Sequence, residues 1–230
     1  MPKKLLAGLL AGAACTGAAA DPGYYLVTPY SQPGRVALDL RYWSVTMRGG
    51  ATHWPEIGLR YGVNSYWTTE LLASFIGPKL NEQSLSSWNW ENLVLLTQGQ
   101  YPVDVGLHLQ AIHSTDDGNV LEWGPVFQTE LGRLQLNGNL IFEHEFHDTG
   151  KADLKYQWQA LYRLAPGWRA GVQGFGELGT WNHWSKRQSH RAGPVLRMGM
   201  GDVELQAGYL WGKVYGQKAK MFTANLVWGF

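Results

Sequence analysis

The last strand-like stretch of the chain is Phe222-Thr-Ala-Asn-Leu-Val-Trp-Gly-Phe230. Its apolar residues alternate with small or polar ones, so that Phe222, Leu226, Trp228 and Phe230 share one face of an extended chain. In a soluble protein this stretch would form a long apolar edge strand with nothing to protect it. We therefore expect the terminal strand to belong to a sheet that leaves no such edge open.

The same period of two recurs through most of the chain. Val36, Leu38 and Leu40 alternate with Asp39 and Arg41, and similar segments begin near residues 35, 55, 66, 87, 103, 119, 134, 152, 168, 190, 203 and 220. Each segment is roughly ten residues long, the length that a tilted strand needs to cross a bilayer, whereas soluble strands usually have about five or six residues. Trp and Tyr stand at the ends of many apolar faces, where aromatic girdles lie. The pattern predicts an all-β, antiparallel, up-and-down transmembrane barrel of about twelve strands.

The composition narrows the class of protein further. The 230-residue chain is 45% hydrophobic but only 16% charged, and it contains 29 Gly, 12 Trp and 11 Tyr. Such a chain is too apolar to be disordered and too aromatic for an ordinary cytosolic domain. The formal net charge of +1 gives no electrostatic basis for binding nucleic acid. After the N-terminus no apolar run approaches the roughly 18 residues of a membrane helix.

The first 20 residues read as a cleavable secretory signal. They begin with Lys3 and Lys4, continue with an apolar stretch and end with the small residues Ala18-Ala19-Ala20. We expect cleavage before Asp21 and export across the inner membrane. Cys15, the single cysteine, lies within this leader, so the mature chain is expected to have no disulfide.

The leader, the alternating strands and the chain end together resemble small bacterial outer-membrane β-barrel proteins. A last strand that ends in Phe is similar to the assembly signal of that class, which implies that Trp228 and Phe230 are read by the barrel-assembly machinery. Further similarity, to a group of uncharacterised proteobacterial barrels, is carried by Ser87-Trp-Asn-Trp-Glu-Asn, Tyr101-Pro-Val-Asp-Val-Gly, Gln157-Trp-Gln and Gly174-Phe-Gly-Glu. The resemblance covers the whole mature chain. It implies a cell outer-membrane location in contact with lipid and lipopolysaccharide, and no particular activity, because the same architecture serves porins and lipid-cleaving enzymes.

In the expected topology, residues 21–34 form a short periplasmic segment and residues 35–230 form one barrel domain. If the first strand rises from the periplasm, every second connection is a tight periplasmic turn and the others are longer outer loops. The periplasmic set is Asn64-Ser65, Gly99–Pro102, Gly132-Arg133, Pro166-Gly167 and Gly201-Asp202, and the outer set includes Gly77–Ser86, Ser114–Gly118, His147–Lys151, Gly179–Ser189 and Gly212–Lys218.

The polar strand faces would line the interior of such a barrel. They carry acidic and basic residues, as in a water-filled passage whose opposed charges orient ions or small polar solutes. The same residues would close the lumen if Arg–Glu pairs and amide hydrogen bonds filled it, and a barrel of about twelve strands lies between filled and open examples. The lumen-lining candidates are Arg41, Glu56, Arg60, Glu70, Glu91, Asp104, Glu122, Glu130, Glu143, Arg163, Arg169, Glu177, Arg191 and Arg197, with Glu204 on the same faces.

The stretch Glu143-His-Glu-Phe-His147 offers metal-binding residue types. In a strand, however, His144 points away from Glu143, Glu145 and His147, and carboxylate-rich sets without fixed geometry bind divalent ions weakly. We therefore expect a solvated strand end, with no metal and no cofactor.

A lipid-modifying enzyme would need a serine within reach of a histidine. The adjacent residues Ser189 and His190 point to opposite sides of a strand. A pairing across strands, such as Ser74 with His108, stays open. No catalytic residue is predicted.

A weak internal repeat is marked by proline. Pro55, Pro125 and Pro194 are spaced 70 and 69 residues apart, each near the start of a descending strand. Four strands per repeat would make three units, although proline is also tolerated at strand starts for backbone reasons alone.

The leading interpretation is passive passage of small polar or ionic solutes. In the expected topology, Glu56, Glu122, Glu143, Glu145 and Glu177 outnumber Arg191 and Lys155 near the outer mouth, which predicts a modest cation preference at low salt. The alternatives are a structural or surface-binding barrel with a closed lumen and, less favoured, an outer-membrane lipid-modifying enzyme.

Overall fold

The computed structural model describes residues 24–115, 118–147 and 151–230. Within these ranges the chain forms twelve strands and no helix that could cross a membrane. The strands are β1 (Val36–Met47), β2 (Gly50–Gly62), β3 (Trp67–Lys79), β4 (Glu82–Leu95), β5 (Asp104–Ser114), β6 (Gly118–Leu131), β7 (Leu134–Glu145), β8 (Asp153–Ala165), β9 (Trp168–Thr180), β10 (Ser189–Met200), β11 (Val203–Val214) and β12 (Gln217–Gly229). The leader expected over residues 1–20 lies outside the described residues.

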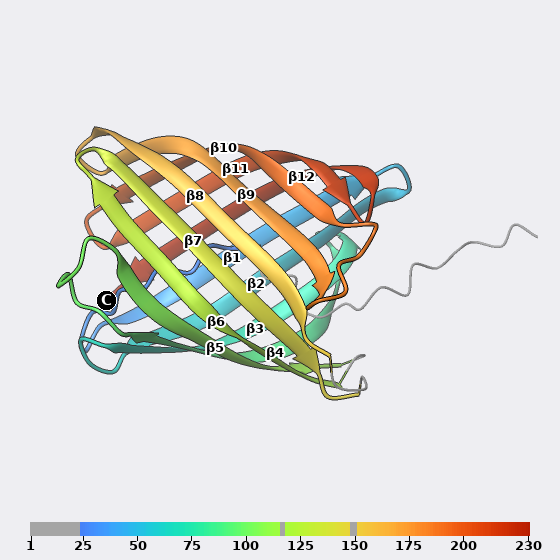
Figure 1. Ribbon diagram of the computed structural model, residues 1–230, viewed down its shortest axis with the longest axis horizontal. Coiled ribbons are helices and arrows are strands. Elements are labelled where there is room, and N and C mark those ends of the chain that lie inside the picture. Colours follow the sequence, from blue (N-terminus) through green and yellow to red (C-terminus); the bar gives the residue numbers. More distant parts are fainter. Residues whose placement is uncertain (1–23, 116–117, 148–150) are drawn as a thin grey trace, which may run out of the picture.

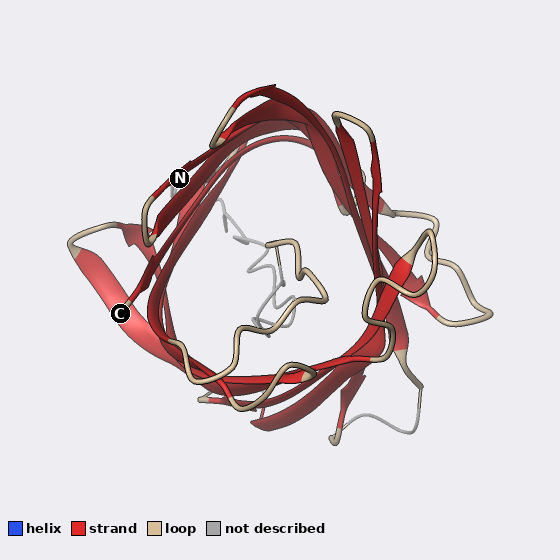
Figure 2. Ribbon diagram, turned by 90° about the vertical axis from the view of Figure 1, so that its left-hand side faces the viewer, coloured by secondary structure: helices blue, strands red, loops and turns tan. Residues whose placement is uncertain are grey.

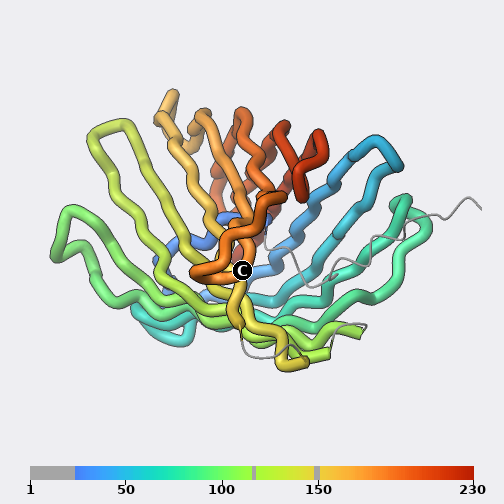
Figure 3. Tube along the Cα trace, turned by 45° about the vertical axis from the view of Figure 1, so that its right-hand side comes forward, coloured from blue at the N-terminus to red at the C-terminus, as the bar shows by residue number. Residues whose placement is uncertain are grey.

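All neighbouring strands pair antiparallel, and the sheet closes into a barrel through β1 and β12 (Figure 1). Across this seam Leu38 faces Trp228 and Arg41 faces Asn225, and the Phe230 N–H donates to the carbonyl of Val36 at 2.9 Å. Both edges of the terminal strand are therefore paired, which removes the exposed edge that its sequence would otherwise create. The prediction of a closed up-and-down barrel of about twelve strands is confirmed. Figure 3 follows the succession of hairpins around it.

The two faces of the strands differ in exposure. On β11, Leu210 is buried while Tyr209 and Trp211 are exposed, and on β12, Met221 is buried while Phe222 is exposed. A shift of one residue would reverse every assignment. The apolar residues that carry the sequence pattern therefore form the outer surface, and the alternate residues face the lumen.

We call the end where β1 starts the proximal end and the opposite end the distal end. The predicted distal loops Gly77–Ser86 and Gly212–Lys218 are wrong, because the strands there continue into hairpins. Only Leu80-Asn81 and Tyr215-Gly216 separate these strands. Tyr215 and Gly216 both have positive φ, 46° and 82°, as the tight turns of two-residue hairpins require.

The proximal connections also depart from expectation. The predicted turn at Gly99–Pro102 is part of a longer connection between Leu95 and Asp104. The predicted proximal turns at Asn64-Ser65, Gly132-Arg133, Pro166-Gly167 and Gly201-Asp202 do lie between strands, as does most of the predicted distal loop at Gly179–Ser189. The expected length difference therefore fails at Gly77–Ser86, Gly212–Lys218 and Gly99–Pro102. In the distal hairpins, Lys79, Gly212 and Lys213 do not end their strands, because the neighbouring strand still pairs with them.

The N-terminal segment, residues 24–34, lies inside the barrel and not in a separate periplasmic segment as expected (Figure 2). Tyr24 and Val27 are 7% and 6% exposed, and each packs in a cluster of inward-facing residues. At the proximal end the Gly34 N–H donates to the carbonyl of Gly62 at 2.7 Å. A Cβ on Gly62 would lie 1.9 Å from the carbonyl oxygen of Gln32, so glycine permits this close approach.

The three spaced prolines occupy equivalent places on β2, β6 and β10. At each of these places the ladder to the next strand in sequence is interrupted. Each proline and the residue before it, Trp54, Gly124 or Gly193, have no partner on that next strand. Because proline lacks an N–H, it is tolerated at such interruptions. The spacing thus marks a recurrent feature at every fourth strand.

Candidate functional site in the lumen

The inner face of the barrel is the candidate site. Cross-strand register places the predicted residues together there: Arg41 faces Glu56, Arg60 faces Glu70, and Glu122 faces Glu143. Burial follows the same parity. On this inner face lie Arg41, Glu56, Arg60, Glu70, Glu91, Asp104, Glu122, Glu130, Glu143, Arg163, Arg169, Glu177, Arg191, Arg197 and Glu204.

The proximal half of the lumen is open enough to hold solvent. Two cavities of about 400 and 320 Å³ lie there, lined in part by Arg197 and Glu204. Arg163 and Arg169 donate to the two oxygens of Glu130 at 3.0 and 2.8 Å, and Arg197 donates to Glu204 at 2.6 Å. These ion pairs are partly exposed, so water screens them and allows their side chains to rearrange.

The middle of the lumen holds a buried charge network. Arg41 lies 3.1 Å from Asp39, 2.9 Å from Glu70 and 3.2 Å from Glu91. Arg60 joins the network at 2.6 Å from Asp39 and 2.9 Å from Glu70. Three carboxylates thus surround two guanidinium groups, beside a cavity of only about 90 Å³. Burial removes water from these charges, so mutual attraction and direct hydrogen bonds must replace the hydration that a solvated ion pair keeps.

Amide side chains from β6 to β11 face the same part of the lumen. Gln159 donates to Gln173 at 3.2 Å and to Gln206 at 3.1 Å, and it borders the same small cavity as Arg41. Gln173 donates onward to Thr223 at 3.0 Å. Further links in this amide network join Gln135 to Gln128 and Asn137, and Asn137 to Gln159. Amides provide both donors and acceptors, so this wall can exchange hydrogen bonds with a polar solute.

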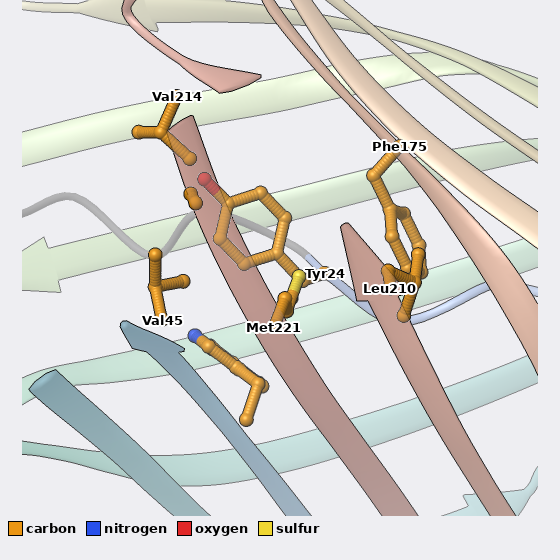
Figure 4. Packing of buried hydrophobic residues seen from close by; sticks show 8 residues of the cluster. Tyr24, Val45, Phe175, Leu210, Val214 and Met221 are labelled. Carbon is orange, nitrogen blue, oxygen red and sulfur yellow. The ribbon is translucent and has the colours of Figure 1, made fainter. Parts of the chain in front are cut away.

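The distal half contains buried ion pairs beside apolar side chains. Lys155 lies between Glu122, at 2.9 Å, and Glu143, with which it also forms an ion pair. Arg191 donates to Glu177 at 2.6 Å. Nearby, an inward-facing apolar cluster is formed by Tyr24, Trp43, Val45, Phe175, Leu210, Val214, Ala219 and Met221 (Figure 4). The cavity between Tyr24, Tyr25 and the wall has a volume of about 10 Å³, so the N-terminal segment packs closely against the wall here, unlike at the proximal cavities.

Three tyrosines attach the N-terminal segment to the lumen wall. Tyr24 donates to Glu177 and lies over the Arg191 guanidinium at 4.2 Å. Tyr25 donates to Glu91 at 2.8 Å and lies over Arg41 at 3.7 Å. Each of these two rings therefore covers a cation and bonds a carboxylate, which combines a cation–π contact with a charge-assisted hydrogen bond.

The third anchor, Tyr30, lies at the proximal side. It donates to Asp104 at 2.6 Å, and partial burial together with this hydrogen bond raises the pKa of Tyr30 to about 12. Between the anchors, Val27 packs against Leu93 and Val126 on the lumen wall. The segment thus follows the lumen from the proximal end to the apolar cluster.

Sequence reasoning missed parts of this site. Asp39 stands on the polar face of its strand, two residues before Arg41, so the alternation of β1 itself places it in the lumen. Charge alone does not identify the inward aromatic and apolar residues, such as Trp43 and Leu210, which are buried in the lumen. The run Tyr24-Tyr-Leu-Val27 was a usable signal, since a solvated segment has no need for four apolar residues in a row.

Side chains of the Glu143–His147 stretch are engaged in other contacts than a shared metal site. Glu143 pairs with Lys155, and His144 lies within 3.3 Å of the Lys151 carbonyl. Among the described residues, no cluster of three or more His, Cys, Asp or Glu could hold a metal ion.

The serine and histidine pairs are likewise engaged elsewhere. Ser74 donates to Glu56, while the His108 ring lies 3.9 Å from Glu122. Ser189 accepts the Tyr215 N–H at 3.0 Å inside the barrel, and His190 bonds Tyr156 at 2.7 Å outside it. The expected opposition of Ser189 and His190 is thus what the structure shows.

Solved structures with the same fold include bacterial outer-membrane channels. An outer membrane channel from Pseudomonas putida F1 matches with a TM-score of 0.63 and 13% identity over 92% of this chain and 100% of that chain. The NanC porin matches at 0.63 with 11% identity over 83% and 98%. The KdgM porin, solved in complex with disordered oligogalacturonate, matches at 0.62 with 6% identity over 84% and 99%. Protein-family models and curated proteins give no match. At these identities the likeness shows a shared fold.

Proposed function

We propose that the protein is a porin-like channel of the cell outer membrane that passes small polar or ionic solutes by passive diffusion. The observation that carries the proposal is the inner face, where proximal cavities of about 400 and 320 Å³ lead to a charge network and an amide-lined wall at mid-lumen. Rings of charge and hydrogen-bonding groups at a constriction are how pores select solutes. The shared fold with outer-membrane channels supports the assignment.

The charge of the inner face favours cations. Of the charged side chains placed on the inner face above, ten are carboxylates and seven are cationic, a balance of minus three, and Glu145 adds one more carboxylate at the distal end of the same face of β7. The ten carboxylates are Asp39, Glu56, Glu70, Glu91, Asp104, Glu122, Glu130, Glu143, Glu177 and Glu204, and the cations are Arg41, Arg60, Lys155, Arg163, Arg169, Arg191 and Arg197. A lumen of one net sign concentrates counter-ions, an effect that salt screens.

A second candidate function is a structural or surface-binding barrel with a closed lumen. It is favoured by the N-terminal segment and the Tyr24 cluster, which pack inside the barrel beside a cavity of about 10 Å³. In the channel proposal, this region and the mid-lumen charge network next to it form the constriction. In the closed-barrel proposal, it is a permanent plug.

The location and partners follow from the same proposal. Export through the leader and insertion by the barrel-assembly machinery, which would read Trp228 and Phe230, place the proximal end in the periplasm. The aromatic outer surface contacts membrane lipid and lipopolysaccharide. Neither a catalytic group nor a cofactor has a part in the proposed passage.

Planar-bilayer recording of the refolded mature chain tests the proposal. Discrete currents with a reversal potential that favours cations are expected. Absence of current from barrels shown to be folded by their heat-modifiable migration would establish the closed barrel instead. A parallel assay for fatty-acid release from phospholipid vesicles is expected to stay at background, and release would point to the enzyme class.

A further inference from the structure

The outer surface of the β11–β12 hairpin carries a compact group of lysines. Lys213, Lys218 and Lys220 are all exposed. Lys213 stands directly opposite Lys218 across the ladder, and Lys220 stands opposite Trp211 on the same outward face. The hairpin forms part of the distal rim at the right of Figure 1. We call these three residues the lysine cluster.

Among the described residues, the lysine cluster forms no ion pair with a carboxylate. Within the described ranges, the lysine ion pairs are those of Lys79 with Glu82 and of Lys155 with its two glutamates. The carboxylates carried by the body of the strands point into the lumen, away from this surface. Like charges directly opposite each other destabilise a strand pair. Repulsion between these lysines therefore destabilises the barrel when no ligand is bound, and a bound anion would remove that repulsion.

The position of the cluster identifies the kind of anion. On the same outward face, the rings of Tyr209 and Trp211 lie 6.2 Å apart, and Phe222 stands opposite Tyr209. Aromatic residues of this kind mark the boundary between the hydrocarbon core and the headgroups. Lys220 lies level with Trp211, and Lys213 and Lys218 lie two residues farther toward the distal end, at the level of membrane headgroups.

We propose that the lysine cluster binds the phosphate groups of a phosphorylated glycolipid of the outer leaflet. Side chains opposite each other on a strand pair have Cβ atoms about 5 Å apart, which allows two ammonium groups to reach one phosphate. The acyl chains of the same molecule would lie against the aromatic surface formed by Tyr209, Trp211 and Phe222. The exposed Arg187 packs beside the Gly216 turn and extends the positive surface. The inference depends on the distal end facing outward, and it holds whether the lumen conducts or not.

Native mass spectrometry of the refolded mature chain with a bis-phosphorylated glucosamine glycolipid tests the proposal. A triple variant, Lys213→Gln, Lys218→Gln and Lys220→Gln, should bind roughly 100-fold more weakly, since each basic residue near an anionic surface contributes about fivefold in affinity. The matched control, Lys79→Gln, Arg133→Gln and Lys151→Gln, removes the same charge elsewhere and should bind as the unchanged protein does.

A second variant separates lipid binding from barrel stability. Lys213→Glu places an opposite charge across from Lys218, so in lipid-free detergent the barrel should unfold at the same or a higher urea concentration. Its glycolipid affinity should nevertheless fall. A loss of affinity that only accompanies unfolding would overturn the proposal.

Measurements with other ligands show which molecule supplies the phosphate. The dephosphorylated glycolipid should bind weakly to every variant, and inorganic phosphate or phosphatidylglycerol should not displace the bis-phosphorylated glycolipid. Equal binding by the triple variant, an equal loss in the control variant, or displacement by inorganic phosphate or phosphatidylglycerol would contradict the assignment.

Discussion

The proximal and distal halves of the lumen use the same residue types in opposite ways. Proximally, the ion pairs of Glu130 and Glu204 are partly exposed and border the large cavities. Distally, Lys155 and Arg191 are buried with their carboxylates beside an apolar cluster. Partly exposed charges can exchange partners with solvent and solute, whereas buried charges depend on the partner they have.

This contrast assigns different roles to the two halves. The distal half and the N-terminal segment should set how much passes and how stable the barrel is. The proximal half should act as a vestibule whose charges can be changed at little cost.

The largest effect is expected from removing the N-terminal segment. Deletion of residues 24–29 leaves Tyr30, Ser31 and the Gly34–Gly62 contact in place, but it empties the distal constriction. Single-channel conductance should rise, because the narrowest part of the lumen widens. The double variant Tyr24→Ala and Tyr25→Ala should give a smaller rise. Unchanged conductance in both folded variants would show that the segment does not restrict the passage.

The next effect concerns stability in the distal half. Lys155→Met should lower the free energy of unfolding by about 3–5 kcal/mol, because Glu122 and Glu143 would be left buried side by side without their cation. Urea unfolding in detergent or vesicles measures the change. The conservative Lys155→Arg should lose less, and a Lys155→Met barrel as stable as the parent would mean that water already solvates this site.

Ion selectivity should respond more to a buried mid-lumen carboxylate, Glu56 opposite Arg41, than to a carboxylate in the proximal half. Glu56→Gln removes one buried negative charge while the amide oxygen can still accept from Ser74. The reversal potential at low salt should move toward weaker cation preference, and the shift should shrink near 1 M salt, where the Debye length is about 3 Å. Glu130→Gln, in the solvated vestibule, should shift it less. The reverse order would contradict the assignment of the constriction.

The smallest effect is expected from Arg163→Gln in the vestibule. Arg163 and Glu130 are about 43% and 40% exposed, and exposed pairs contribute roughly 0–1 kcal/mol. Glu130 also retains Arg169. A loss comparable to that of Lys155→Met would erase the distinction between the two halves.

The sequence predicted the features that depend on local alternation. A period of two shows which residues share a face, so the strands and the inward position of residues such as Glu122 and Arg163 could be worked out from spacing alone. Hairpin ends were harder, because Gly212 and Lys213 look like loop residues while the ladder of β11 and β12 keeps them extended.

The N-terminal segment could not be placed in the same way. Tyr24 and Glu177 are 153 residues apart in the chain, and no period or motif connects them. Their contact depends on the closed barrel, which brings distant strands around one axis. The constriction is therefore a property of tertiary structure, and only the apolar run from Tyr24 to Val27 hints at it.

Site-directed thiol labelling during planar-bilayer recording tests most directly whether the lumen is the passage. The mature chain that starts at Asp21 would contain no cysteine, so Gln206→Cys and Leu205→Cys each introduce a single thiol. Gln206 faces the mid-lumen cavity, and its neighbour Leu205 points to the opposite face of β11. A small charged thiol reagent should reduce the current through Gln206→Cys and leave Leu205→Cys unaffected. An unchanged current in Gln206→Cys after complete labelling, or block of Leu205→Cys, would contradict the account.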